Sequence, residues 1–377
     1  KNKVIDITTM ATITSLLFGY IMVFAWITRS VSSMTLPFLK NSIANANKLG
    51  KKSTAFEVLK ELNSSDSVAY YVTKGGRHRD APGTAIVTGG NTGIGIITVA
   101  TLAEAGMTVI LCTRNIEKGR TAIEKNIPKQ FHKQVSVQQL DLADMTSIQT
   151  ACAQIRNENE SIEVIVNNAG VMSPPTRLET TQKLELQFGT NHVGHHLFTR
   201  LLLPNVNKHG RIVTVASSAH SMGKPGTGAD WGTRSYSPWG AYGDSKLANI
   251  YFAKELKDRL VSAGQNNIES VTLHPGVIST NLWQYSPSVA QKLVGVFLAD
   301  KTVEQGAATS VYCALSTDVE GGGYYDNCQL STPKLVADDS TAQKQLWDYT
   351  ERLIIEEGFE LPVQLLGVPQ ESLLEVQ

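Results

Sequence analysis

Residues 84–95 read TAIVTGGNTGIG. The β-branched run 84–88 is typical of a buried strand, and the glycines that follow it stand where the chain turns into a helix. A second apolar strand is expected over 107–112. Glycines in such a turn let the backbone approach a pyrophosphate, whose charge is held by N–H groups at the start of the helix. The pattern predicts a dinucleotide site, against the alternative of a tight turn without ligand, and its candidate residues are Gly89, Asn91, Thr92, Gly93, Ile94 and Gly95.

The end of the second strand indicates which nicotinamide cofactor fits. An NAD site needs a carboxylate there to accept the ribose hydroxyls, whereas this chain has Thr113, Arg114 and Asn115. No carboxylate would repel a 2′-phosphate, and the guanidinium of Arg114 could pair with it. We therefore expect NADP(H) as the cofactor. The alternative is that Arg114 is an ordinary solvated charge at the start of the next helix.

Further strands and helices alternate along the rest of the chain. This alternation predicts a doubly wound α/β fold, in which helices cover both faces of a parallel sheet. Two of the strands end in candidate cofactor contacts: Asp141, suited to an adenine edge, and the run Asn168, Ala169 and Gly170. The other expected strands are 135–140, 162–166, 211–216 and 268–273, and the expected helices are 116–126, 145–157, 181–203 and 241–263.

Tyr242 and Lys246 are four residues apart at the start of a predicted helix, so their side chains lie on one face. The ordinary pKa of a phenol, about 10, is high for proton exchange at neutral pH. A nearby ammonium favours the phenolate, and acid–base catalysis works best when the pKa approaches ambient pH. The pair predicts a tyrosine acid–base centre that Lys246 tunes while it also binds the nicotinamide ribose, although this spacing often occurs by chance.

Two more polar groups fit such a centre. Ser217 and Ser218 follow a predicted strand at the edge where open α/β sheets bind ligands, and a hydroxyl there can stabilise a substrate carbonyl. A helix cap or a turn is the alternative. Asn191 is a poor residue for the interior of the predicted helix 181–203. We hypothesise that its amide holds a water that connects Lys246 to solvent.

The three histidines at 192, 195 and 196 invite a metal interpretation, because His192 and His196 share a helix face. No carboxylate or cysteine lies close to them in sequence. We interpret them as packing or surface histidines and predict no metal site.

The composition fits one large domain. The 377 residues are 42% hydrophobic, and 34 basic side chains balance 34 acidic ones, so nothing indicates nucleic-acid binding. The cysteines lack redox or zinc spacing, which indicates reduced thiols at Cys112, Cys152, Cys313 and Cys328.

The N-terminal region predicts attachment or targeting. Residues 10–27 are uncharged and just long enough to span a bilayer, and basic residues follow them, which favours a membrane anchor with the catalytic domain facing the cytosol. The endoplasmic reticulum is the favoured membrane, with a plastid or another organelle as an alternative. A cleaved signal and a transit peptide also remain open. We expect a linker over 29–82 with a helix at 53–62 capped by Ser53, a catalytic domain over 83–360 and a tail over 361–377.

These motifs together resemble the short-chain dehydrogenase/reductase family. The likeness rests on Thr88, Gly89, Gly93, Gly95, the run 167–170, Asn191, Ser218, Tyr242, Lys246 and the run 274–276. The details NHVGH (191–195), YGDSKLAN (242–249) and GYYDNC (323–328) are similar to the retinol-dehydrogenase-like branch, which includes the WW-domain oxidoreductase and a plant chloroplast-translocon dehydrogenase.

The resemblance implies a single Rossmann domain with seven strands and a catalytic set of Asn191, Ser218, Tyr242 and Lys246. In that family the second serine of such a pair is the catalytic one. The resemblance also places Pro275, Gly276, Val277 and Thr280 beside the nicotinamide, and it implies that the helices carrying Asn191 and Tyr242 can form a homodimer interface.

The substrate is expected to be a lipophilic aldehyde, ketone, retinoid or steroid. Trp231, Tyr236 and Trp239 lie in the long segment between the serines and Tyr242, where aromatic side chains could wall a pocket. The amphipathic segment 286–298 is suited to a lid. The rival is an NADPH-sensing regulatory subunit of a membrane complex with little turnover. An intact catalytic set argues against that rival, because a sensor has no need of the serine.

Overall fold

The computed structural model describes residues 49–65, 67, 83–226, 231–278 and 300–362. The segment 10–27, the expected lid 286–298 and Thr280 lie outside these residues, so the anchor, the lid and that contact remain predictions. Within the described part of the chain, no helix has the length and hydropathy needed to cross a bilayer.

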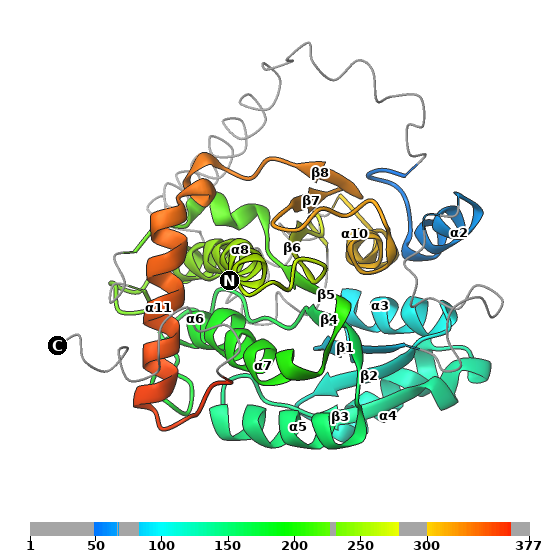
Figure 1. Cartoon of the computed structure of the whole chain (residues 1–377), viewed down its shortest axis with the longest axis horizontal. Helices are drawn as coiled ribbons and strands as arrows, with labels where there is room; N and C mark the ends of the chain where they lie inside the picture. Colours follow the sequence, from blue (N-terminus) through cyan, green and yellow to red (C-terminus); the bar gives the residue numbers. More distant parts are fainter. Residues whose placement is uncertain (1–48, 66, 68–82, 227–230, 279–299, 363–377) are drawn as a thin grey trace, which may run out of the picture. The chain divides into compact units, whose positions relative to one another are not determined.

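The strand β1 (Thr84–Thr88) lies inside an eight-stranded sheet with the order β3-β2-β1-β4-β5-β6-β7-β8 (Figure 1). Every pair is parallel except β7–β8. The order reverses between β1 and β4, where open α/β sheets bind their ligands. The doubly wound α/β prediction is confirmed. The other strands are β2 Thr108–Thr113, β3 Val135–Gln139, β4 Ile162–Asn167, β5 Val206–Val215, β6 Glu269–His274, β7 Tyr324–Asp326 and β8 Gln329–Ser331.

The eighth strand departs from the seven that the resemblance implied. Asn327 and Cys328 have φ angles of 54° and 60°, the left-handed pair that a tight hairpin needs. The hairpin returns the chain antiparallel to β7, with Tyr325 opposite Leu330. The expected sheet was therefore one strand too small, because asparagine followed by cysteine is a weak turn signal.

Helices cover both faces of the sheet and form two apolar layers. The side chains of alternate β1 residues pack in opposite layers, with Ile86 in one and Val87 in the other. One layer contains α2 Ala55–Ser65, α3 Gly93–Glu104, α4 Ile116–Asn126 and α10 Val303–Leu315. The other contains α5 Met145–Glu158, α7 Gly194–Leu202, α8 Pro238–Ser262 and α11 Ser340–Glu356. All four cysteines are buried as free thiols within these layers.

The helix expected at 53–62 is α2, and its cap differs from the prediction. The Thr54 hydroxyl accepts from the Glu57 N–H, and the Glu57 carboxylate accepts from the Thr54 N–H, which makes a capping box. Ser53 instead accepts from the Gly50 N–H, so Ser53 as the cap is wrong. The apolar face of α2, with Val58 fully buried, packs on α10, so this part of the chain belongs to the catalytic core.

The helix predicted over 181–203 is shorter and interrupted. It begins as α6 (Leu186–Phe188), whose first N–H groups are capped by the Glu185 carboxylate. A π-helical turn, Gly189–Val193, then precedes α7. A Cβ on Gly189 would lie 2.4 Å from the Thr180 methyl, and one on Gly194 would lie 2.4 Å from the Leu142 carbonyl oxygen. Glycine is therefore required at both ends of the turn, which contains Asn191.

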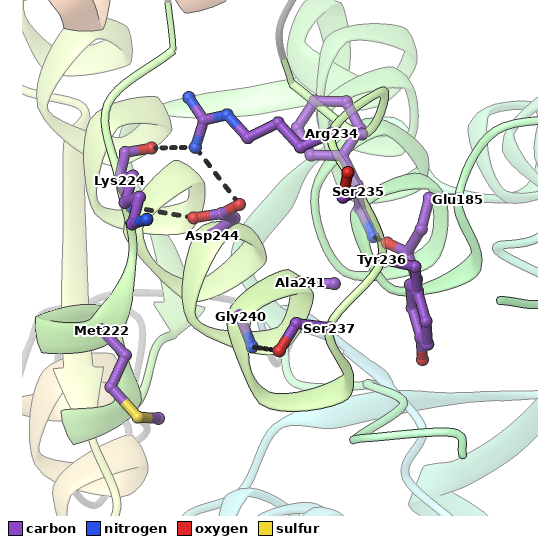
Figure 2. Close-up of a pocket in the computed structure, with 12 residues that line it drawn as sticks. Glu185, Met222, Lys224, Arg234, Ser235, Tyr236, Ser237, Gly240, Ala241 and Asp244 are labelled. Carbon is purple, nitrogen blue, oxygen red and sulfur yellow. Dashed lines mark hydrogen bonds and ion pairs between the residues drawn. The ribbon is translucent and has the colours of Figure 1, made fainter. Parts of the chain in front are cut away.

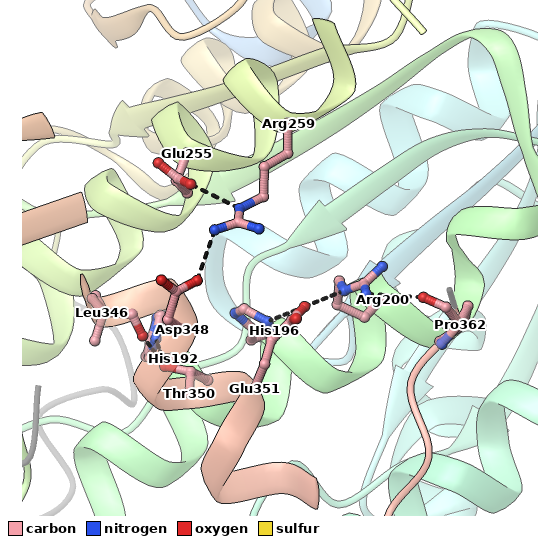
Figure 3. A network of polar contacts seen from close by, with 10 residues as sticks. All are labelled: His192, His196, Arg200, Glu255, Arg259, Leu346, Asp348, Thr350, Glu351 and Pro362. Carbon is pink, nitrogen blue, oxygen red and sulfur yellow. Dashed lines mark hydrogen bonds and ion pairs between the residues drawn. The ribbon is translucent and has the colours of Figure 1, made fainter. Parts of the chain in front are cut away.

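The C-terminal helix α11 lies across α7 and α8, and a buried ionic network holds it there (Figure 3). The Arg200 Nε donates to Glu351 at 2.6 Å, and His196 lies 3.5 Å from the same carboxylate. Burial alone would raise the pKa of Glu351, but the nearby His196 imidazole and the Arg200 charge lower it to about 2. The carboxylate therefore stays ionised inside the protein.

This arrangement bears on the expected dimer. The rings of Phe252 on α8 and Trp347 on α11 stack 5.7 Å apart, and Arg259 on α8 donates to Asp348 at 2.8 Å. The part of α7 and α8 that carries Arg200, Phe252 and Arg259 is thus covered by the chain's own helix. The homodimer through these helices remains a prediction.

Candidate active site

Tyr242 and Lys246 lie side by side in the first turns of α8, and both are almost fully buried. The ammonium is 5.8 Å from the centre of the tyrosine ring and donates to the Val215 carbonyl at 2.9 Å. Burial raises the pKa of Tyr242 to about 12 and lowers that of Lys246 to about 8. Burial dominates the pKa of Tyr242 in this structure, and the tuning of that pKa by Lys246 remains a prediction. Tyr242 is a protonated phenol at neutral pH.

The serine pair follows β5 close to Tyr242. The Ser217 hydroxyl is near enough to lower the phenol pKa slightly against the effect of burial, and its oxygen accepts from the Ala219 N–H at 3.2 Å. Ser218 is exposed. The assignment of Ser218 as the catalytic serine remains a prediction, and the approach of Ser217 to Tyr242 makes Ser217 the alternative.

Two histidines hold this serine turn. The Lys334 N–H donates to His220 Nε2 at 3.1 Å, so Nδ1 carries the proton that is given to the Ser217 carbonyl at 2.6 Å. On the other side, His274 Nδ1 accepts from the Ser218 N–H at 3.1 Å. Burial lowers the pKa of both imidazoles, that of His274 to about 3, which keeps them neutral. The sequence analysis missed these roles, although His220 follows the serine pair and His274 ends β6.

Asn191 is fully buried in its π-helical turn. Its Nδ2 group donates to the Val171 carbonyl at 2.9 Å and to the Ser245 hydroxyl at 3.0 Å, and its Oδ1 accepts from the Val171 N–H at 2.8 Å. Ser245 in turn donates to the Tyr242 carbonyl. Both amide hydrogens of Asn191 are therefore used within the protein. This geometry favours a structural role for Asn191, in which it holds the helical turn of Tyr242, and disfavours the water relay that we hypothesised.

The glycine turn fits the pyrophosphate of a dinucleotide. Gly89 and Gly93 have φ angles of 63° and 55°, and a Cβ on Gly95 would lie 2.4 Å from the Gly89 carbonyl oxygen. The Thr92 side chain does not cap α3, which leaves the first N–H groups of that helix to a ligand. The Asn168 Nδ2 donates to the Thr88 carbonyl at 2.7 Å, while its Oδ1 is buried without a partner among the described residues.

The predicted contacts at the two ends of the cofactor lie at the same edge of the sheet. Arg114 is exposed directly after β2. Asp141 follows β3, and one of its carboxylate oxygens accepts from the Ala143 N–H at 3.0 Å. At the other end, Gly276 has a φ of 93° and packs against the Lys301 side chain, and the Val277 N–H donates to Asp300 at 3.2 Å.

Apolar side chains surround the reactive tyrosine. Met172, Ala219 and Tyr242 form a small buried cluster against which Trp239 packs, with the Trp239 and Tyr242 rings 6.1 Å apart. Trp231 does not join them. It is fully buried and stacks on Phe188, so its expected place in a substrate wall is wrong.

A cavity of about 300 Å³ lies along the first turns of α8 (Figure 2). Tyr236 lines it, together with the Arg234 and Asp244 side chains, which are 3.4 Å apart, and with Met222. Of the three aromatic residues predicted to wall a pocket, Trp239 lies beside Tyr242 and Tyr236 lines this cavity.

The profile of the short chain dehydrogenase family matches residues 83–290. The chain belongs to this family of oxidoreductases, whose members use a nicotinamide dinucleotide. Within the family it lies in the retinol-dehydrogenase-like branch. It is 37% identical over 268 residues to retinol dehydrogenase 11 of Mus musculus, covering 70% of this chain and 84% of the relative.

Two further comparisons agree with this family. The chain is 36% identical to the short-chain dehydrogenase TIC 32 B, chloroplastic, of Brassica napus, over 72% of this chain and 88% of the relative. The structure of an uncharacterized protein from Mycobacterium paratuberculosis matches with a TM-score of 0.60 and 33% identity, over 75% of this chain and 96% of the other. The family resemblance is confirmed.

Proposed function

We propose that this protein interconverts a lipophilic carbonyl compound and its alcohol with NADP(H). The observation that carries the proposal is the cluster of Tyr242, Lys246 and the serine pair 217–218 at the sheet edge that also holds the glycine turn. When bound, NADPH supplies the hydride that the carbonyl carbon receives. Side chains of this protein donate the proton and stabilise the charge that develops on the carbonyl oxygen.

The Tyr242 hydroxyl donates its proton to the carbonyl oxygen as the carbon is reduced, so that one hydride and one proton give the alcohol. Burial keeps this phenol protonated at neutral pH, ready to donate. Ser218, the predicted oxyanion donor, donates to the same oxygen and stabilises its developing charge. Lys246, whose pKa is about 8, is mostly cationic at pH 7 and adds a positive charge to the site.

Arg114 supports the choice of NADP(H). It is exposed at the end of β2, and the following residue, Asn115, uses its side chain to cap α4 through the Lys118 N–H. We expect Arg114→Ala to lower kcat/KM for NADPH by about 10- to 100-fold, the loss of one charge-assisted contact, with kcat/KM for NADH nearly unchanged. Paired initial-rate assays with the two cofactors measure this. Equal losses with both would contradict a 2′-phosphate contact.

The apolar side chains Met172, Ala219 and Trp239 around Tyr242 support a lipophilic substrate. Relatives named retinol dehydrogenase point the same way. The test is NADPH oxidation with retinal, a long-chain aldehyde and a small polar ketone, with NADH in parallel. Faster reduction of the polar ketone would contradict the substrate class. Binding of NADPH without turnover of any carbonyl would identify a sensor instead.

The serine pair provides a matched control for the mechanism. We expect Ser218→Ala to lower kcat about 100-fold, as removal of an oxyanion donor does, and Ser217→Ala to leave it within about threefold. Tyr242→Phe should lower kcat at least about 1,000-fold because it removes the acid. If Ser217→Ala inactivates the enzyme and Ser218→Ala does not, the assignment of Ser218 is wrong and Ser217 is the donor.

A further inference from the structure

His195 lies in the buried space between the cofactor site and the catalytic tyrosine, and about 1% of its surface is exposed. Its Nε2 is 2.8 Å from the Thr88 hydroxyl at the end of β1. Its Nδ1 is 2.9 Å from the carbonyl oxygen of Asn191. One imidazole thus joins the strand that leads into the glycine turn to the π-helical turn that contains Asn191.

The partners of His195 fix its protonation. A carbonyl oxygen only accepts, so Nδ1 must carry the hydrogen that is donated to Asn191. In a neutral ring Nε2 is then the acceptor, and the Thr88 hydroxyl donates to it. Burial, with a smaller effect of the Lys246 charge, lowers the pKa of His195 to about 4, which keeps the ring neutral.

Thr88 is fully engaged as well. Its hydroxyl oxygen accepts from the backbone N–H groups of Asn168, at 2.9 Å, and Ala169, at 3.0 Å. With its hydrogen given to His195, the hydroxyl has one donated and two accepted bonds, the full capacity of the group. His195 therefore orients the hydroxyl that aligns the ends of β1 and β4 below the expected cofactor.

The path continues to the reactive residue. From Asn191 it runs through the side-chain amide to Ser245, and the Ser245 hydroxyl donates to the Tyr242 carbonyl at 2.8 Å. Hydrogen bonds thus connect β1, the π-helical turn and α8 through buried groups, where each bond is costly to leave unmade.

We infer that His195 is a positioning residue for the reaction: it holds the Asn191 turn, and through Ser245 the backbone of Tyr242, in register with the cofactor strand. This inference rests on the proposed oxidoreductase function. It assigns His195 no contact with the substrate or the cofactor.

The two arms of the imidazole are not equivalent, which makes the inference testable. If a substitution removes Nε2, the Thr88 hydroxyl can still donate to the Val166 carbonyl oxygen, which lies 3.4 Å away. We therefore expect cofactor binding to be retained. The Nδ1 arm holds the catalytic side. His195→Asn keeps an N–H donor at the Nδ1 position, whereas His195→Gln moves the amide to the Nε2 position and loses that donor.

Steady-state kinetics of the full-length protein give the first readout. For His195→Gln we expect kcat about tenfold lower, the cost of one misplaced hydrogen bond, with the NADPH dissociation constant within about threefold of wild type. For His195→Asn we expect kcat within about threefold. Wild-type kcat in His195→Gln, or equal losses in both variants, would overturn the inference.

A second measurement needs no substrate and no folded Gln variant. In wild-type protein labelled with ¹⁵N-histidine, two-bond ¹H–¹⁵N spectra should show His195 as the Nδ1–H tautomer, with the signal assigned by its loss in His195→Asn. An Nε2–H tautomer would overturn the network even if carbonyl turnover is found. The Nδ1–H tautomer without turnover would leave the geometry intact and count against the proposed function alone.

Discussion

The inner and outer faces of the segment 189–202 use the same residue type in different ways. On the inner face, His195 has a hydrogen-bond partner at both ring nitrogens. On the outer face, His192 and His196 each keep an Nδ1 without a hydrogen bond among the described residues, and their rings pack against Phe252.

The difference comes from what covers each face. The inner face meets the ends of β1 and β4, where backbone N–H and hydroxyl groups need partners. The outer face meets α11, a helix about 150 residues later in the chain, which brings Thr350, Glu351 and the Trp347 ring. A histidine on this segment therefore serves the active site or the packing of α11 according to the element that covers it.

The largest effect is expected on the outer face. Arg200→Met should lower the free energy of unfolding by about 3–5 kcal/mol, because Glu351 is left buried with His196 as its remaining close partner. Chemical denaturation measures this, and kcat of the folded enzyme should stay unchanged. The double variant Arg200→Met/Glu351→Leu should recover most of the loss. If Arg200→Met lowered kcat without lowering the free energy of unfolding, the assignment of the outer face to packing and the inner face to the active site would be wrong.

A smaller effect is expected from acid on the inner face. The folded-state pKa of His195 is about 4, below the ordinary value of 6.5, so the unfolded chain takes up its proton first as the pH falls. Its contribution to stability is complete above pH 6.5 and is lost between about pH 6.5 and 4. From pH 7.5 to 5, wild type should lose about 2 kcal/mol more than His195→Asn in urea unfolding.

The matched outer-face variant sharpens this comparison. The carboxylate of Glu351 partly offsets the effect of burial on the pKa of His196. We therefore expect His196→Asn to change the pH dependence of the free energy of unfolding less than His195→Asn does. If the free energy of unfolding depended on pH in the same way in wild type, His195→Asn and His196→Asn, neither imidazole would be held neutral by the fold.

The smallest effect is expected from a single hydroxyl. Thr350→Val removes the partner that lies 3.0 Å from His192 Nε2 and should lower the free energy of unfolding by about 1 kcal/mol. Thr350→Ser keeps the hydroxyl and serves as the control. Thermal and urea unfolding measure both variants, and turnover should be unaffected. A change in kcat would mean that the outer face is coupled to the chemistry.

The sequence predicted those features that depend on local pattern. The apolar strands, the glycine turn and the spacing of Tyr242 and Lys246 each follow from a few neighbouring residues, and the structure has the strands and helices near their expected positions. Where the pattern was local but ambiguous, the prediction failed by one residue. The cap of α2 is such a case, because Ser53 and Thr54 are both good capping residues and only Thr54 pairs with Glu57.

Features set by distant contacts were out of reach. The glycines that bound the π-helical turn, Gly189 and Gly194, lie against Thr180 and Leu142, and no periodicity shows such contacts. The roles of His195 and His220 depend on partners at Thr88 and Lys334, more than 100 positions away. The position of α11 was unforeseen for the same reason.

The cover that α11 provides has a consequence for how the enzyme behaves on dilution. A face protected by a second subunit is exposed whenever the complex dissociates, so its protection follows mass action. Here the protecting helix is tethered to the face by the same polypeptide. The burial that α11 gives to Arg200 and Phe252 is therefore independent of the protein concentration.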